Sequence, residues 1–159
     1  MSRRRRTWQC ISVVLAVVVA TTWFLHVRPA HRDEHARDTL PAMTALAVSR
    51  MLTYAPETVA DDLEAAARGL GGTFRREFEE YSRSAVIPLS TERSVAQRGD
   101  VKGVALESVN GDDAVAVVYV DQTTVSVDRT EPRTVQTVVR VRVHHDGNQW
   151  LLVSFDPIF

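Results

Sequence analysis

The sequence is poor in cysteine, because Cys10 is the only one among its 159 residues. A single cysteine cannot form a disulfide within the chain and cannot build a thiolate cluster around a metal ion. Cys10 also lies inside an apolar segment, where cysteine usually packs as a small hydrophobic side chain. The sequence therefore excludes an internal disulfide framework. Reversible acylation of Cys10 near a membrane boundary stays open as an alternative.

Acidic residues are absent from the first 27 positions, although the whole chain has 20 Asp and Glu. Four of the 19 basic residues, Arg3, Arg4, Arg5 and Arg6, stand in that stretch. The rest of the chain is therefore mildly acidic, even though the formal net charge is only −1. Binding of nucleic acid needs a basic surface that neutralises phosphates, so we predict no nucleic-acid partner.

Residues 8–27, WQCISVVLAVVVATTWFLHV, contain no Asp, Glu, Lys or Arg. About 20 such residues suffice for a helix to cross the hydrocarbon core of a bilayer. The cluster Arg3–Arg6 determines the predicted topology, because basic clusters are retained on the cytoplasmic side. We therefore predict a cytoplasmic tail over 1–7 and a single-pass helix over 8–27 in the cell (plasma) membrane, with the C-terminal part extracytoplasmic. A cleaved signal peptide is the alternative, but the apolar run is long for one and no clear Ala-x-Ala site follows.

The segment after the anchor is predicted to be a polar juxtamembrane stalk over 28–41, because Pro29 closes the anchor and Pro41 interrupts the next helical pattern. Residues 42–159 then form the predicted folded domain. Its first helix, over 42–54, has an apolar stripe at helical spacing. The stripe consists of Met43, Leu46, Ala47, Met51 and Tyr54.

Two further helices follow. The second begins at Thr58, where Asp61 three residues later resembles a capping box, and it ends at the glycines Gly69, Gly71 and Gly72. The third, over 73–86, has an apolar face, and Pro88 is expected to stop it. That face consists of Phe74, Phe78, Tyr81 and Ala85.

The second half of the domain is rich in β-branched residues and predicts four strands. These cover residues 93–109, 113–124, 134–145 and 149–155. Asn110-Gly111 and Asp146-Gly147 are dipeptides that favour tight hairpin turns. Residues 114–120 are apolar at every position, apart from the hydroxyl of Tyr119. Apolar side chains at successive positions indicate a strand that is covered on both faces. The predicted fold class is α+β, with about three helices packed on a curved, cone-like, four-stranded antiparallel sheet.

Few residues have the pattern of a chemical site. His31 to His35 spells H-x-x-E-H, a zinc-peptidase pattern, but it lies in the charged stalk beside the membrane and without a cleft. Tyr54, Tyr81 and Asp121 are the candidate pocket-lining residues, as acids or bases between helices and sheet. Packed core aromatics and a strand-end aspartate are the alternative. No catalytic motif is present, so we predict a non-enzyme with no metal and no cofactor.

The order of these features resembles the Mce-associated membrane proteins of actinobacteria, where Mce stands for mammalian cell entry. The matching pieces are Met51–Tyr54, Phe74–Phe78, Val86–Leu89, Val120–Thr124, Glu131–Arg133, Asp146–Leu152 and Asp156-Pro157. Pro41 and the glycine-rich corner before residue 73 depart from the family's pattern. The resemblance implies a fold similar to nuclear transport factor 2-like domains and to VirB-type scaffold components of type IV secretion.

The resemblance also implies a function, which is that of an accessory subunit stabilising a Mce lipid-import complex. Its partners would be the membrane and Mce subunits or other membrane proteins, with a lipid as a further candidate. Two alternatives remain open at this point. One is a binding domain for a lipid or steroid-like ligand, and the other is a small enzyme of the same fold that uses Tyr54 and Asp121.

Overall fold

The computed structural model of the chain describes residues 37–158. The predicted tail over 1–7, the anchor over 8–27 with the arginines before it, and the motif at His31–His35 lie outside these residues. Those expectations therefore remain predictions. Among residues 37–158, no helix is both long enough and apolar enough to span a membrane.

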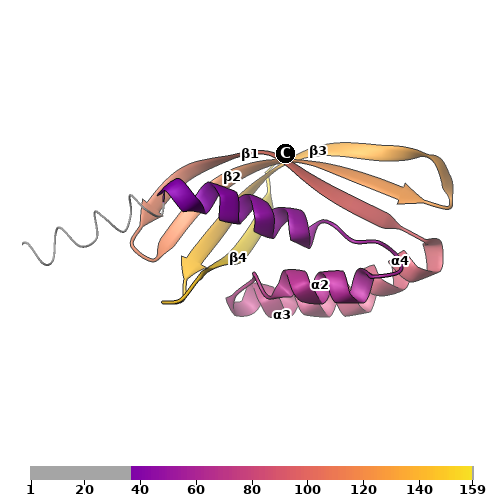
Figure 1. The fold of residues 1–159 in the computed structure, drawn as a ribbon, viewed down its shortest axis with the longest axis horizontal. Helices are drawn as coiled ribbons and strands as arrows, with labels where there is room; N and C mark the ends of the chain where they lie inside the picture. The colour runs from indigo at the N-terminus through magenta and orange to yellow at the C-terminus, as the bar shows by residue number, and fades with distance from the viewer. Residues whose placement is uncertain (1–36, 159) are drawn as a thin grey trace, which may run out of the picture. The chain divides into compact units, whose positions relative to one another are not determined.

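The described domain consists of a helical layer that covers one face of an antiparallel sheet (Figure 1). A helix over 37–51 comes first, drawn in indigo. The helices α2 (Val59–Ala67), α3 (Gly72–Tyr81), the π-helical turn η1 (Ser82–Val86) and α4 (Ile87–Arg93) follow. The strands are β1 (Ala96–Asn110), β2 (Asp113–Ser126), β3 (Arg129–His145) and β4 (Trp150–Pro157). The prediction of an α+β fold with a four-stranded antiparallel sheet is confirmed.

The sheet is a meander in which each strand pairs with the next, in the order β1-β2-β3-β4. Both predicted turn dipeptides form hairpins, and their glycines adopt positive φ angles of 61° at Gly111 and 93° at Gly147. The Asp146 carboxylate accepts hydrogen bonds from the backbone N–H groups of Asn148 and Gln149, each 2.9 Å long. The β2–β3 hairpin is longer than predicted. Its strand β3 includes Pro132, in the part of the strand that β4 does not reach.

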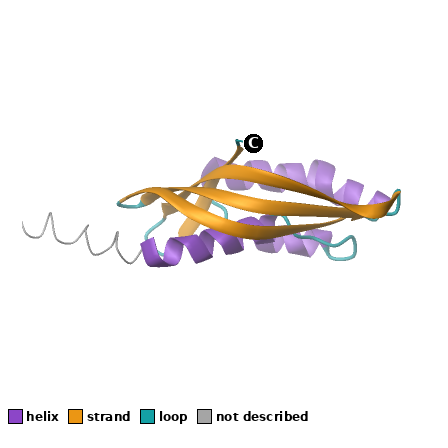
Figure 2. Ribbon diagram, turned by 90° about the horizontal axis from the view of Figure 1, so that it is seen from above, coloured by secondary structure: helices purple, strands orange, loops and turns teal. Residues whose placement is uncertain are grey.

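The core lies between the helices and the inner face of the sheet. The buried apolar residues of β2 and β3 alternate along their strands, and Val109 of β1 and Leu152 of β4 are buried with them. Those of β2 and β3 are Ala114, Ala116, Val118, Val120, Val139, Val141 and Val143. The side chains between them point to the opposite face, where Tyr119 is 51% exposed. The expectation that β2 is covered on both faces is therefore wrong for the described domain, and Figure 2 shows the strands with no helix in front of them.

The first described helix differs from its prediction in both extent and orientation. It runs without interruption from residue 37 to residue 51, so Pro41 lies within it and residues 37–41 belong to the domain rather than to a stalk. Its buried face is formed by Leu40, Thr44, Val48 and Met51, whereas Met43 of the predicted stripe is 41% exposed. Burying this face against the sheet offsets the hydrogen bond that a helical proline loses.

The glycine-rich corner after α2 has a structural reason. The backbone there pairs with β4, because the Gly71 N–H donates to the Leu152 carbonyl (2.9 Å) and the Leu152 N–H donates to the Gly69 carbonyl (3.0 Å). A Cβ atom at Gly71 would lie only 3.0 Å from the Cβ of Leu151. The absence of a side chain therefore lets this segment lie against the outermost strand and cover its edge.

The third helix continues beyond its predicted end. Residues 82–86 form a π-helical turn, in which the Ile87 N–H donates to the carbonyl of Ser82, and α4 then extends to Arg93. Pro88 occupies the first turn of α4, where an N–H is not required. Pro88 therefore follows a π-bulge instead of ending the helix.

Candidate functional site

The candidate site is a cavity of about 370 Å³ between the helices and the sheet. We name it the α3 cavity, because α3 supplies four of its lining residues: Phe74, Glu77, Phe78 and Tyr81. The other sides come from the end of the first helix, from α2, η1 and β1, and from Phe155 of β4. Its volume falls within the range of small-molecule sites in proteins.

The interior of the α3 cavity is apolar. Met51 and Leu63 are buried and form its deepest part, whereas Phe74, Phe78 and Phe155 are half-buried around it. The helix α3 has no buried residue at all among its ten, although its apolar residues share one face. The neighbouring α2, by contrast, buries four of its nine. The apolar face of α3 is thus only partly covered by the described protein.

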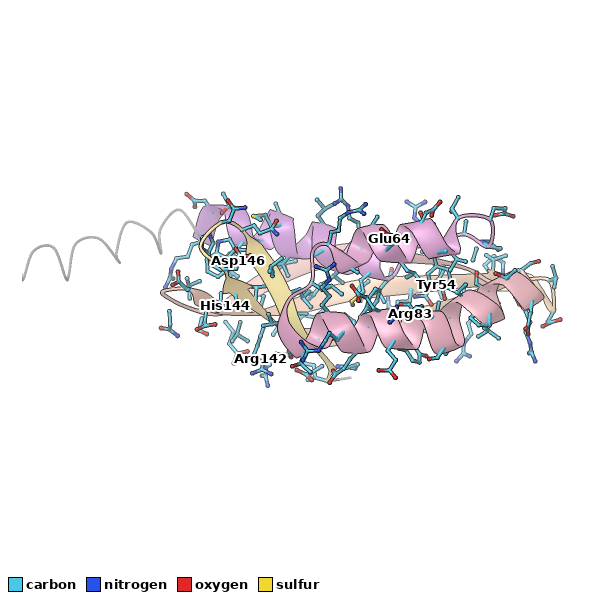
Figure 3. All side chains as sticks on the ribbon, turned by 90° about the horizontal axis from the view of Figure 1, so that it is seen from below. Tyr54, Glu64, Arg83, Arg142, His144 and Asp146 are labelled. Atoms are coloured by element: carbon cyan, nitrogen blue, oxygen red, sulfur yellow. The ribbon has the colours of Figure 1, made fainter. Side chains whose placement is uncertain are left out.

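Backbone pairing fixes the position of Tyr54 at this cavity. The Tyr54 N–H donates to the Gln97 carbonyl (2.9 Å), and the Gln97 N–H donates to the Tyr54 carbonyl (3.0 Å). The side chain of Gln97 donates to the carbonyl of Leu52 (3.2 Å). The segment after the first helix therefore lies along the edge of β1, with the Tyr54 ring between the helices and the sheet (Figure 3).

The close approach of this segment depends on Gly99 in β1. The Gly99 N–H donates a hydrogen bond to the Thr53 hydroxyl oxygen (3.1 Å). The Gly99 carbonyl accepts a hydrogen bond from the Ser49 hydroxyl (2.8 Å). A Cβ atom at Gly99 would lie 2.6 Å from the Cβ of Leu52. No other residue type fits this position without moving the helix from the strand.

The polar groups of the cavity are few. Burial raises the pKa of the Tyr54 hydroxyl, and the nearby Tyr81 raises it further, so Tyr54 stays protonated at neutral pH. No described residue accepts a hydrogen bond from that hydroxyl. Glu77 is exposed at the cavity's mouth and is the one charged residue among those that line it. The arrangement can therefore donate a hydrogen bond inside and holds a negative charge outside.

The three residues predicted to line one pocket do not come together. Tyr54 and Tyr81 line the α3 cavity, but Asp121 does not. Asp121 alternates with the buried Val120 along β2 and thus points to the uncovered face of the sheet, where Lys102 lies 3.7 Å away. The sequence did not single out Phe155 or Gln97. Alternation along β4 gave no signal for Phe155, because a bulge between Leu152 and Ser154 puts Phe155, which pairs with Val141, on the same face as Leu152.

The uncovered face of the sheet, which we name the open face, combines apolar and charged side chains. Val115 and Val117 are half-buried there and Tyr119 is exposed. Most of the charged residues around them have an oppositely charged partner, whereas no described residue forms an ion pair with Arg142, which lies opposite Val115. Lys102 contacts both Asp100 and Asp121, Arg140 lies 3.0 Å from Glu107, and His144 lies 2.8 Å from Asp113.

The adjacent histidines at the end of β3 diverge, because successive side chains of a strand point to opposite faces. His144 contacts Asp113, whereas the ring of His145 packs edge-on against Trp150 at a centroid distance of 5.2 Å. Figure 3 shows His144 near the end of the domain opposite to Tyr54. Within residues 37–158, no group of three or more His, Cys, Asp or Glu side chains is arranged to hold a metal ion.

Solved structures share this fold. An IcmL-like type IV secretion system protein from Legionella pneumophila superposes with a TM-score of 0.62 at 11% identity, covering 77% of this chain and 94% of its own. The VirB8 protein of Agrobacterium tumefaciens gives a TM-score of 0.57 at 10% identity, covering 74% of this chain and 88% of its own. The predicted likeness to VirB-type proteins is therefore confirmed at the level of the fold.

Sequence relatives come from Mycobacterium tuberculosis. The "Uncharacterized protein Rv1362c" is 26% identical over 98% of this chain and 74% of its own length. The "Outer membrane protein Rv1973" is 33% identical over 127 residues, which cover 80% of this chain and 76% of that protein. No protein-family model matches the chain. The extent and identity of the second similarity show that the chain belongs to the family of the Mycobacterium tuberculosis outer membrane protein Rv1973.

Proposed function

We propose that this chain is a non-catalytic, membrane-attached assembly protein, whose folded domain binds a partner membrane protein through the open face of its sheet. The observation that carries the proposal is the composition of that face. Val117 and Tyr119 present apolar surface without any cover from the described helices, while Arg140 beside them is paired with Glu107 and Lys102 with Asp121. Apolar surface bordered by self-paired charges is suited to a protein partner.

Membrane attachment is supported by two independent features. The relative at 33% identity is called an outer membrane protein, and residues 8–27 of this chain have the length and composition of a membrane-spanning helix. An assembly role is supported by analogy of fold with the IcmL-like type IV secretion system protein. Asp121 does not line the α3 cavity, which argues against the alternative of an enzyme that uses Tyr54 and Asp121 together.

For the complex itself, we propose a Mce-type lipid-import assembly. The support is the resemblance to Mce-associated membrane proteins, whose matching pieces include Met51–Tyr54 and Asp146–Leu152. The first piece holds the end of a helix against β1, and the second forms the β3–β4 hairpin. Both pieces have structural roles and do not contact a known partner. The Mce complex is therefore a more specific proposal than the assembly role, and it is tested separately.

The test replaces the chromosomal copy in the native host with variants and measures Mce subunits by quantitative mass spectrometry. Deletion of residues 42–159 should lower the abundance of these subunits. A full-length chain with Val117→Thr and Tyr119→Thr should do the same, because threonine keeps the strand but removes apolar surface from the open face. Glu64→Lys on α2 is the matched control, since that side chain is exposed on the helical side.

Two results distinguish the levels of the proposal. Unchanged Mce subunits and unchanged lipid uptake in the deletion strain would reject the Mce assignment. A photo-crosslinking amino acid at position 119 should still capture a membrane protein if the assembly role is correct. Failure to capture any membrane protein, together with normal behaviour of the threonine variant, would reject the open face as the docking surface.

A further inference from the structure

We propose that the α3 cavity binds an uncharged apolar small molecule that carries one hydroxyl or carbonyl oxygen. This proposal is independent of the open face, because the cavity lies on the helical side of the sheet. It depends on three properties of the cavity. These are an apolar face left partly uncovered, a hydrogen-bond donor inside, and a charge of one sign at the mouth.

The uncovered apolar surface identifies the body of the ligand. Phe74 and Phe78 lie one helical turn apart on α3 and both face the cavity, yet neither is buried. Phe155 faces them from β4, and Met51 and Leu63 close the interior. A space of about 370 Å³ with this lining accepts a hydrocarbon chain or a fused-ring skeleton. Water in the same space would gain few hydrogen bonds from these side chains.

The donor identifies the ligand's polar group. Tyr54 is half-buried at the cavity, is held there through its backbone pairing with Gln97, and donates its hydroxyl proton to no described residue. Water or a ligand can supply the acceptor, because the Tyr54 hydroxyl is not one of the fully buried hydroxyls that lack a partner in residues 37–158. A ligand oxygen of the hydroxyl, ketone or ester type provides one. An ammonium head does not, because it has donors only.

The charge at the mouth disfavours anionic ligands. Glu77 is exposed there, and no Lys, Arg or His is among the lining residues. A carboxylate or phosphate head beside Glu77 would meet repulsion without a compensating cation. A fatty acid is therefore a poor ligand, whereas a monoacylglycerol or a sterol combines an apolar body with a neutral oxygen.

The experiment uses the full chain in nanodiscs of dioleoylphosphatidylcholine and a monoacylglycerol with a diazirine on its acyl chain. We expect saturable labelling within residues 74–86 or at β4, mapped by mass spectrometry, and competition by unlabelled monoolein. Oleate at pH 8 should compete at least about 10-fold more weakly, and Glu77→Gln should narrow that difference.

Matched variants separate specific binding from adsorption. Tyr54→Phe removes only the hydroxyl and should weaken monoolein about 3- to 10-fold, as expected for one hydrogen bond. Tyr119→Phe is its control, because that ring is 51% exposed on the open face and does not line the cavity. Phe78→Gln should abolish labelling, whereas Glu80→Gln on the exposed side of α3 should not.

Several outcomes would overturn the proposal. Labelling confined to residues 8–27 would mean that the probe only partitions into the membrane. Labelling of Phe78→Gln to the same extent as the unchanged chain would mean the same. Stronger competition by oleate than by monoolein would refute the charge argument. A polypeptide captured by a photo-crosslinker at position 78, with no saturable lipid labelling, would assign the cavity to a protein partner instead.

Discussion

Gly99 should be the most sensitive small residue of the domain, because the first helix and β1 approach each other most closely there. Gly99→Ala would place a Cβ atom 2.6 Å from the Cβ of Leu52 and 3.4 Å from its Cδ1. Carbon atoms in proteins pack at about 3.5–4.0 Å, so the helix end and the strand must separate by roughly 1 Å. Neither backbone can rotate away, because hydrogen bonds fix both.

The cost follows from these contacts. Overpacking of this kind costs about 1–3 kcal/mol. A separation of roughly 1 Å would also stretch the bonds of Gly99 to Ser49 (2.8 Å) and Thr53 (3.1 Å) beyond hydrogen-bond range. Each lost bond adds about 0.5–1.5 kcal/mol. Alanine also lowers the conformational entropy of the unfolded chain, which stabilises the folded state by about 0.4–1 kcal/mol. The expected net loss in the free energy of unfolding is about 1–5 kcal/mol, with a central value of about 3 kcal/mol.

The measurement is urea unfolding of the purified full-length chain, followed by far-UV circular dichroism. The midpoint should fall at an unchanged slope, and the melting temperature should drop by roughly 4 °C for each kcal/mol. Gly103→Ala is the matched control on the same strand, because a Cβ there meets nothing within 4 Å and φ is not positive. It should leave stability unchanged or raise it by up to about 1 kcal/mol. Equal effects of the two variants would refute the close approach.

Three further predictions concern the helices and the last hairpin. Leu40→Ala should lower the free energy of unfolding by about 3–5 kcal/mol, because Leu40 is fully buried. Met43→Ala should lower it by less than about 1 kcal/mol, because Met43 is exposed. The reverse order in urea unfolding would mean that the stripe predicted from the sequence, with Met43 inside, is the buried face. Asp62→Ala should cost about 0.5–2 kcal/mol, since Asp62 accepts from the Thr58 hydroxyl (2.7 Å) and the Ala55 N–H, and Asp61→Ala should be nearly silent in the same assay. The N–H groups of Gln149 and Asn148 lower the pKa of Asp146, so its contribution is present above about pH 4 and is lost as the pH falls through the folded-state value. Asp146→Asn should therefore flatten the acid side of the stability profile, and an unchanged profile would contradict this.

The capping of α2 illustrates how near a local pattern comes to the structure. The sequence indicated a helix start at Thr58 with an acidic partner, and α2 does begin at Val59. The partner is Asp62 rather than Asp61, because the Thr58 hydroxyl donates to the carboxylate four residues later. Local chemistry selects the residue types at a helix start, whereas the direction of the incoming chain selects which carboxylate is used.

The candidate site was predicted in part. Tyr54 and Tyr81 were named from the sequence and line one cavity, but Asp121 points away from it. Whether a strand residue faces helices or solvent depends on which face the helices cover, and a strand that is apolar on both faces carries no signal of this. Residues 114–120 are such a strand, so its orientation could not be predicted.

The sequence by itself determined the order of the elements, the two glycine turns and the α+β class, because turn chemistry and hydrophobic periodicity act over a few neighbouring residues. It also carried the membrane anchor over 8–27, which lies outside residues 37–158 and remains a prediction, and the resemblance to Mce-associated proteins. Only the tertiary structure decided the path of the helix through Pro41, the need for glycine at position 99 and the half-covered face of α3. Each of these depends on packing between segments that are distant along the chain, and such packing leaves no local periodicity to read.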